Sequence, residues 1–353
     1  MSVSPPAAAP VITSQPSLEC DVTSTCPLGR GEQVFPTDDR EAENSMAGST
    51  TALWAVDAAE TGTDRAGGVP FHRALVHDRR RVGRGVAAIV LVVVGLFGFG
   101  SVITWLAAQV DLSMGRVNPT LGGDDVTILF QAAGAASIAL LIPWSMLVQR
   151  WLYGVRGRSL ISVVSRFRFD EFGRALLFAG PLAILFIAIV SLVTPVEPAR
   201  FSSADLIGLL AVTLLLTPLQ AAGEEFGFRG LVLRVASSWN RNPRTALIVG
   251  VVVSAALFSA IHFQSNPWLN LNYLTLGVGA ALITWRTGGL ETAVVLHALN
   301  NTVSFTFALV LHTDLLGGTG EPALLLLAVP TVATTAAVFA SARQHGPTTQ
   351  PNH

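Results

Sequence analysis

The chain has 353 residues, of which 51% are hydrophobic and only 13% are charged, and its mean hydropathy is +0.54. This composition excludes an ordinary soluble protein, in which charged residues make up about a quarter of the total. All 22 basic residues are arginine and the formal net charge is only −1, so the sequence does not indicate a nucleic-acid-binding protein.

Residues 1–80 form a polar segment that is rich in Ser, Thr, Pro, Ala and Gly. The segment has neither the period of a helix nor the alternation of a strand, so we expect a disordered cytoplasmic tail. Both cysteines, Cys20 and Cys26, lie within it. A disulfide framework or a thiolate metal site inside the membrane is therefore not expected.

The rest of the chain is a series of long apolar runs, and a membrane-spanning helix needs about 20 apolar residues. The fold expected for residues 81–345 is all-α, a polytopic membrane bundle of about eight transmembrane helices. The expected spans are 86–108, 126–147, 175–193, 206–235, 246–263, 271–285, 290–311 and 322–340.

The orientation of the spans is predicted from the arginines in the short loops. Sixteen arginines fall on the side that holds the two termini, whereas only Arg116 and Arg200 fall on the other side. Since cytoplasmic loops carry the excess of basic residues, both termini are expected in the cytoplasm of a multi-pass protein of the plasma membrane. Residues 159–172 mix apolar residues with arginine, which predicts a helix lying at the membrane interface.

Ionisable residues within predicted spans are costly and therefore mark candidate functional sites. Glu224, Glu225 and Arg229 lie near the end of the fourth span. Glu225 and Arg229 are four residues apart on one helix face, so we expect an ion pair with a structural role. Glu224 points about 100° away from Glu225 and is free to act as a base.

Two further pairs have the same spacing of four residues. His297 and Asn301 lie in the seventh span and can address one metal ion, water or oxyanion, and Phe258 and His262 lie near the end of the fifth span. Glu291 and His312, at the two ends of the seventh span, are expected to be solvated at the interface.

These residues carry a resemblance to a known family. Glu224-Glu225-Phe-Gly-Phe-Arg229 resembles the EExxxR motif of the CPBP family, Phe258-Ser-Ala-Ile-His262 its FxxxH motif, and His297-Ala-Leu-Asn-Asn301 its HxxxN motif. The family comprises type II CAAX prenyl endopeptidases and the bacteriocin-processing or Abi proteins of bacteria. The resemblance covers residues 175–315 and leaves residues 1–80 without a counterpart.

The resemblance implies an intramembrane endopeptidase acting on a peptide or protein in the bilayer. Glu224 would activate water with help from His262, and His297 and Asn301 would bind the scissile carbonyl oxygen. Glu225, Arg229 and Phe258 would support the site. The family is described both as metalloproteases and as glutamate-dependent proteases, so Glu224, His262 and His297 are also candidate zinc ligands.

Two other classes of function remain open at this stage. A proton-coupled transporter would use the same glutamates and histidines, although no inverted repeat relates the two halves of the chain. A non-catalytic immunity or scaffold protein would leave the complete set of motif residues without a purpose. The all-arginine, alanine-rich chain looks bacterial, which favours leader removal or self-immunity over cleavage of a prenylated protein.

Overall fold

The computed structural model describes residues 69–76, 81–193, 202–312 and 322–341. The disordered tail was predicted for residues 1–80, and all of it except residues 69–76 lies outside these ranges. In the described ranges the chain is helical and forms no strand beyond an isolated bridge between Ser162 and Gly289, which confirms the all-α prediction.

The helices follow the apolar runs in chain order. They are η1 (Phe71–Arg73), α1 (Val82–Ser113), η2 (Pro119–Leu121), α2 (Ile128–Ala139), α3 (Leu141–Tyr153), η3 (Gly157–Leu160), α4 (Phe169–Val193), α5 (Ser203–Glu225), η4 (Phe226–Val232), α6 (Leu233–Ser237), α7 (Pro243–Ala260), α8 (Pro267–Thr287), α9 (Glu291–Leu311), η5 (Pro322–Ala328) and α10 (Val329–Ala340).

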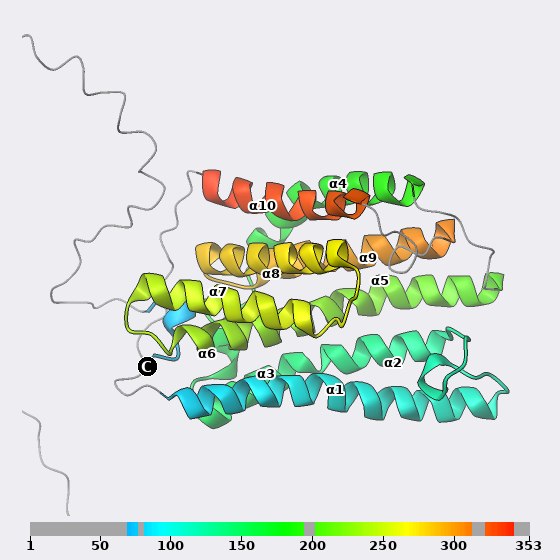
Figure 1. Cartoon of the computed structure of the whole chain (residues 1–353), viewed down its shortest axis with the longest axis horizontal. Coiled ribbons are helices and arrows are strands. Elements are labelled where there is room, and N and C mark those ends of the chain that lie inside the picture. The colour runs from blue at the N-terminus through cyan, green and yellow to red at the C-terminus, as the bar shows by residue number, and fades with distance from the viewer. Residues whose placement is uncertain (1–68, 77–80, 194–201, 313–321, 342–353) are drawn as a thin grey trace, which may run out of the picture. The chain divides into compact units, whose positions relative to one another are not determined.

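Neighbouring helices pack in an order that differs from their order in the chain. Helix α5 lies between α2 and α9, α4 packs on α9, and α10 packs on both α4 and α8. Figure 1 shows α1 on one side of this set and α4 with α10 on the other. Helices α5 and α9 are therefore central, and they carry most of the ionisable residues singled out above.

Each predicted span coincides with a helix or with helices in direct succession. Among the described residues, six segments are long and apolar enough to cross a membrane: Val82–Ser113, Ile128–Tyr153, Phe169–Val193, Ser203–Ser237, Pro243–Ala260 and Glu291–Leu311. Helix α8 and the shorter segment Leu325–Ala340 correspond to the remaining two predictions but are not in this set.

Ordered structure begins ahead of the expected boundary at residue 81. Phe71 and Leu75 are buried, and the guanidinium of Arg73 donates hydrogen bonds to the carbonyl oxygens of Asn240, at 2.6 Å, and Arg241, at 3.1 Å. These bonds fasten residues 69–76 to the turn between α6 and α7.

The interface helix predicted at residues 159–172 was wrong. The segment contains the end of the short helix η3 and then an irregular segment of turns and bends, residues 161–168, beside the α8–α9 turn, where Val163 N donates to Gly288 O and Leu290 N donates to Ile161 O. Residues 169–172 are the first turn of α4. Leu160 and Val163 are fully buried, so these apolar side chains pack inside the protein rather than against lipid.

The predicted solvation of Glu291 was also wrong. Its side chain is fully buried and its two carboxylate oxygens accept bonds from Arg168, from Nε at 2.9 Å and from Nη2 at 2.7 Å. The backbone N–H of Arg168 donates to the same carboxylate. A buried carboxylate needs such a partner, and Arg168 supplies it from the irregular segment.

Candidate functional site

The site is built around the end of α5, where Glu224 and Glu225 are both buried. Gly223 precedes them and lies so close to α2 that a Cβ atom there would overlap the carbonyl oxygen of Ile138. After Glu225 the helix widens into the π-helix η4, a form that is frequent at functional sites. The two carboxylates therefore sit in the interior of the bundle rather than at its surface.

Glu225 binds two partners through a single oxygen. Its Oε1 lies 2.9 Å from Nη1 of Arg229 and 2.7 Å from Nδ1 of His297, and all three side chains are buried. The expected ion pair between Glu225 and Arg229 is present. The bond to His297 on α9 was not anticipated, and it connects the first motif to the third.

Glu224 faces the other nitrogen of the same imidazole. Its Oε2 lies 3.8 Å from Nε2 of His297 and has no hydrogen-bond partner among the described residues. Asn301 Nδ2 lies 3.2 Å from the same Nε2, and the Asn301 carbonyl oxygen accepts a bond from Asn300 at 3.1 Å. The two glutamates of the first motif thus lie at the two nitrogens of the imidazole of the third motif, Glu225 at Nδ1 and Glu224 near Nε2.

These bonds select one tautomer of His297. Because a carboxylate accepts only, the proton lies on Nδ1 and is donated to Glu225. Because Asn300 donates to Oδ1 of Asn301, the Asn301 amide presents its N–H to Nε2, which accepts it. In this tautomer Nε2 has no proton of its own to donate.

Phe258 lies at the centre of the cluster. Its ring contacts His262 at 4.8 Å and His297 at 5.4 Å between centroids, and the Arg229 guanidinium carbon lies 4.0 Å from its centroid. A cation above an aromatic face is stabilised by the ring quadrupole. Phe258 therefore contacts both His262 and the guanidinium group of Arg229.

His262 lies two residues beyond the end of α7, with Nδ1 2.7 Å from the carbonyl oxygen of Phe258. Since a carbonyl only accepts, Nδ1 carries the proton and Nε2 is left as the acceptor. Glu224 and His297 are among the ionisable groups that interact electrostatically with this ring. The structure thus gathers Glu224, His262, His297 and Asn301, from three helices, around Phe258.

Comparisons with known proteins agree with the motifs. Residues 206–303 match the Rce1-like family of type II CAAX prenyl endopeptidases. An uncharacterized Bacillus subtilis protein, YyaK, is 31% identical over 225 residues, which cover 60% of this chain and 73% of that protein. The chain belongs to the Rce1-like family. No solved structure matches it.

Membership of this family, together with the six membrane-competent helices, makes the chain a multipass membrane protein of the CAAX-protease type. The matched residues 206–303 contain all three motifs and run from the start of α5 into α9. The central helices of the bundle are thus the ones that carry the Rce1-like sequence.

A bound metal was one of the two chemistries left open for this Rce1-like chain. Three ligands are needed even for an open catalytic zinc site. In the part of the chain that the structure describes, no group of three or more His, Cys, Asp or Glu side chains is arranged to hold a metal ion. Nε2 of His297 already accepts the Asn301 N–H, so the side chains as arranged do not present three open ligand atoms to a zinc ion.

One residue of the site escaped the sequence reasoning. Tyr273 on α8 stacks on His262 with 4.0 Å between ring centroids and an interplanar angle of 23°. It lies in the sixth span, which carries no motif, and the chain has only two tyrosines. A tyrosine near the start of a predicted span was the available signal, because its hydroxyl needs a partner when it is buried.

Proposed function

We propose that this protein is an intramembrane endopeptidase that hydrolyses a peptide bond of a membrane-associated protein or peptide. The observation that carries the proposal is the buried Glu224 carboxylate, whose Oε2 has no hydrogen-bond partner among the described residues and faces Nε2 of His297 at 3.8 Å. A carboxylate without a structural partner, beside two imidazoles and an amide, suits general-base catalysis.

In the first step Glu224 takes a proton from water while the water oxygen attacks the scissile carbonyl carbon. His262 orients this water by accepting a hydrogen bond at Nε2, because its Nδ1 is bound to Phe258. Tyr273, stacked on the ring, holds its plane in place.

Negative charge then develops on the carbonyl oxygen. Asn301 donates its second amide N–H to that oxygen, since its first is directed at His297. Nε2 of His297 accepts the first Asn301 N–H and so orients the amide towards the carbonyl oxygen. The C–N bond breaks as the proton taken by Glu224 passes to the leaving amine, which restores the carboxylate.

Glu225 and Arg229 act as supports in this scheme. The Glu225 carboxylate fixes the His297 tautomer, and Arg229 neutralises Glu225. The absence of a three-ligand cluster in the described residues favours this metal-independent route over a zinc mechanism.

For the substrate we favour a bacterial membrane-associated peptide, by leader removal or self-immunity, over a prenylated protein. The all-arginine composition and the similarity to a Bacillus subtilis protein support this choice. The arginine distribution supports a plasma-membrane location with both termini in the cytoplasm.

The test compares membrane peptides by mass spectrometry from cells that carry the wild-type protein and cells that carry Glu224→Gln at equal abundance. Peptides that end at a common bond should appear only with the wild type. Identical peptide sets would refute the peptidase proposal and favour the non-catalytic scaffold.

A further inference from the structure

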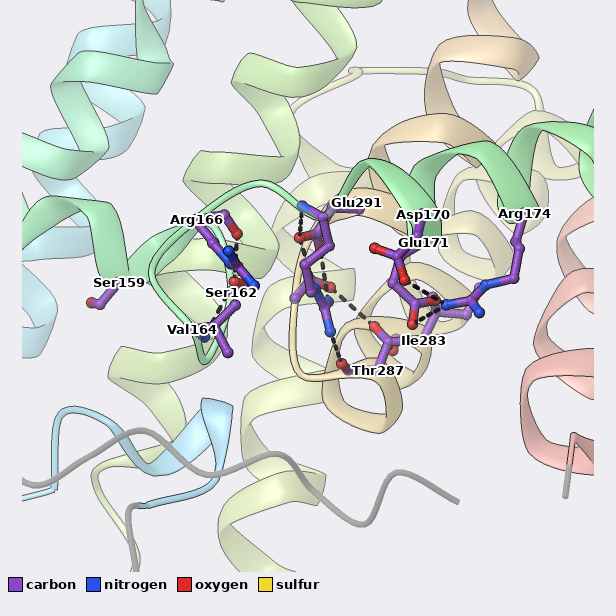
Figure 2. A network of polar contacts seen from close by, with 12 residues as sticks. Ser159, Ser162, Val164, Arg166, Asp170, Glu171, Arg174, Ile283, Thr287 and Glu291 are labelled. Carbon is purple, nitrogen blue, oxygen red and sulfur yellow. Dashed lines mark hydrogen bonds and ion pairs between the residues drawn. The ribbon is translucent and has the colours of Figure 1, made fainter. Parts of the chain in front are cut away.

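A second polar site lies at the arginine-rich end of the bundle, apart from the cluster around Glu224. A pocket of about 460 Å³ opens between the start of α4, the α8–α9 turn and the end of α10. None of the residues Glu224, His262, His297 or Asn301 lines it. The irregular segment that precedes α4 supplies one wall, and Figure 2 shows Arg166 on this segment and Glu291 next to it.

The pocket carries an excess of positive charge. Four arginines line it, Arg166, Arg168, Arg174 and Arg286, against the carboxylates of Asp170 and Glu171 and that of Glu291, which binds Arg168, so one positive charge is left over. Two of the arginines have carboxylate partners. Arg168 binds Glu291. Arg174 binds both Asp170 and Glu171, as Figure 2 shows.

The other two arginines are available to a ligand. Within the ranges that the structure describes, neither Arg166 nor Arg286 forms an ion pair with a carboxylate. Arg166 is exposed and Arg286 is half-buried above the ring of Phe339, so both guanidinium groups are held at the pocket without a counter-charge. A guanidinium fork matches the geometry of a phosphate group.

A buried hydroxyl points to a ligand independently of the charges. Thr334 of α10 lines the pocket, is only 2% exposed, and its Oγ1 has no hydrogen-bond partner among the described residues. Buried polar atoms are nearly always paired, so an orphaned hydroxyl in the wall of a pocket suits a polar ligand.

One further wall of the pocket is apolar and leads out to an exposed part of α4. Ala175 and Phe178 of α4 and Ala337 and Val338 of α10 line the pocket, and Phe178 is 45% exposed. The next residues along α4, Leu176 and Leu177, are exposed on a helix that is apolar enough to span a membrane. A ligand with a charged head and an apolar chain fits both halves of this pocket.

We propose that this pocket binds the headgroup phosphate of an anionic phospholipid, with Arg166, Arg286 and Thr334 on the phosphate and an acyl chain lying between α4 and α10. Basic pockets between transmembrane helices at the cytoplasmic side are suited to such headgroups. Free inorganic phosphate shares the charged chemistry but not the apolar chain, which separates the two ligands experimentally.

The experiment measures lipid retention on the full-length protein by native mass spectrometry, with phosphatidylglycerol or phosphatidylcholine added in detergent. Wild type should retain phosphatidylglycerol in preference to phosphatidylcholine. The double variant R166Q/R286Q should lower phosphatidylglycerol retention roughly tenfold or more, because two charge-assisted contacts are lost. The matched control R150Q/R158Q removes two exposed arginines that do not line the pocket, and it should retain the lipid.

A second variant distinguishes the loss of the lipid site from a loss of folding. Thr334→Val removes only the hydroxyl, should lower phosphatidylglycerol retention, and should leave the thermal unfolding midpoint without lipid unchanged or higher. Equal loss in both double variants, equal retention of the two lipids, or displacement of the lipid by inorganic phosphate would each overturn the proposal.

Discussion

Nδ1 of His297 lies 2.7 Å from Oε1 of Glu225, and this contact joins α9 to the end of α5. The same oxygen receives Arg229 at 2.9 Å. The Glu225 carboxylate therefore holds the imidazole of His297 in place and neutralises the buried Arg229. Glu225 thus has a supporting role, whereas the neighbouring Glu224 is free to act as the base.

Arg229→Ala should reduce the amount of folded protein. The substitution leaves the fully buried Glu225 without its cation, and breaking a buried pair costs about 3–5 kcal/mol. The measurement is the thermal unfolding midpoint in detergent, with the exposed Arg150→Ala as the control. A midpoint equal to that of wild type would contradict the supporting role of the pair.

Arg168 and Glu291 should be coupled energetically, because Glu291 is fully buried against Arg168. In a cycle of Arg168→Met, Glu291→Leu and the double variant, the double variant should lose at least about 1 kcal/mol less than the sum of the single losses. Arg174→Met, whose ion pairs are exposed, should cost roughly 0–1 kcal/mol. Additive losses for Arg168 and Glu291 would show that the pair does not hold the irregular segment of residues 161–168 in place.

His72 should make stability depend on pH. Burial, with a smaller contribution from the adjacent Arg73, lowers the pKa of His72 from 6.5 to about 4. The unfolded chain binds this proton more tightly, so stability is complete above about pH 6.5 and is lost as the pH falls towards 4, by about 3 kcal/mol in total.

The check on His72 is the unfolding midpoint across this pH range. His72→Asn should flatten the part of the pH dependence that belongs to this residue, whereas the control His312→Asn should not. An unchanged slope in His72→Asn would mean that residues 69–76 are not packed against α6 and α7 as described.

Chelation should leave peptide hydrolysis unchanged, because the described side chains form no three-ligand cluster. The assay follows turnover of the purified protein with and without EDTA, and zinc is then added back. Loss of turnover with EDTA and its recovery with zinc would contradict the metal-independent route.

Much of the fold could be predicted because long apolar runs are read directly from the sequence. The runs at 86–108 and 175–193 fall within α1 and α4, and span six extends four residues earlier than expected because Asn266 caps α8 ahead of Pro267. The spacing of four residues between Glu225 and Arg229 likewise predicted their ion pair, since that spacing fixes two side chains on one face.

Contacts between distant segments were not predictable in this way. The bond from Glu225 to His297 spans 72 residues, and that from Arg168 to Glu291 spans 123. Residues 159–172 resembled an interfacial helix because they mix apolar residues with arginine. The same composition occurs in a segment that buries its apolar side chains and one arginine inside the protein. Only the position of the buried Glu291 shows that Arg168 is directed into the protein.

The most direct test of the account is the turnover of purified Glu224→Gln on a peptide that the wild-type protein cleaves, measured beside the unfolding midpoint of both proteins. The substitution keeps the shape of the side chain and removes only the charge that accepts a proton. We predict a fall in kcat of about 10²–10⁴-fold with an unchanged midpoint. Turnover equal to that of wild type would contradict the role of Glu224 as the base.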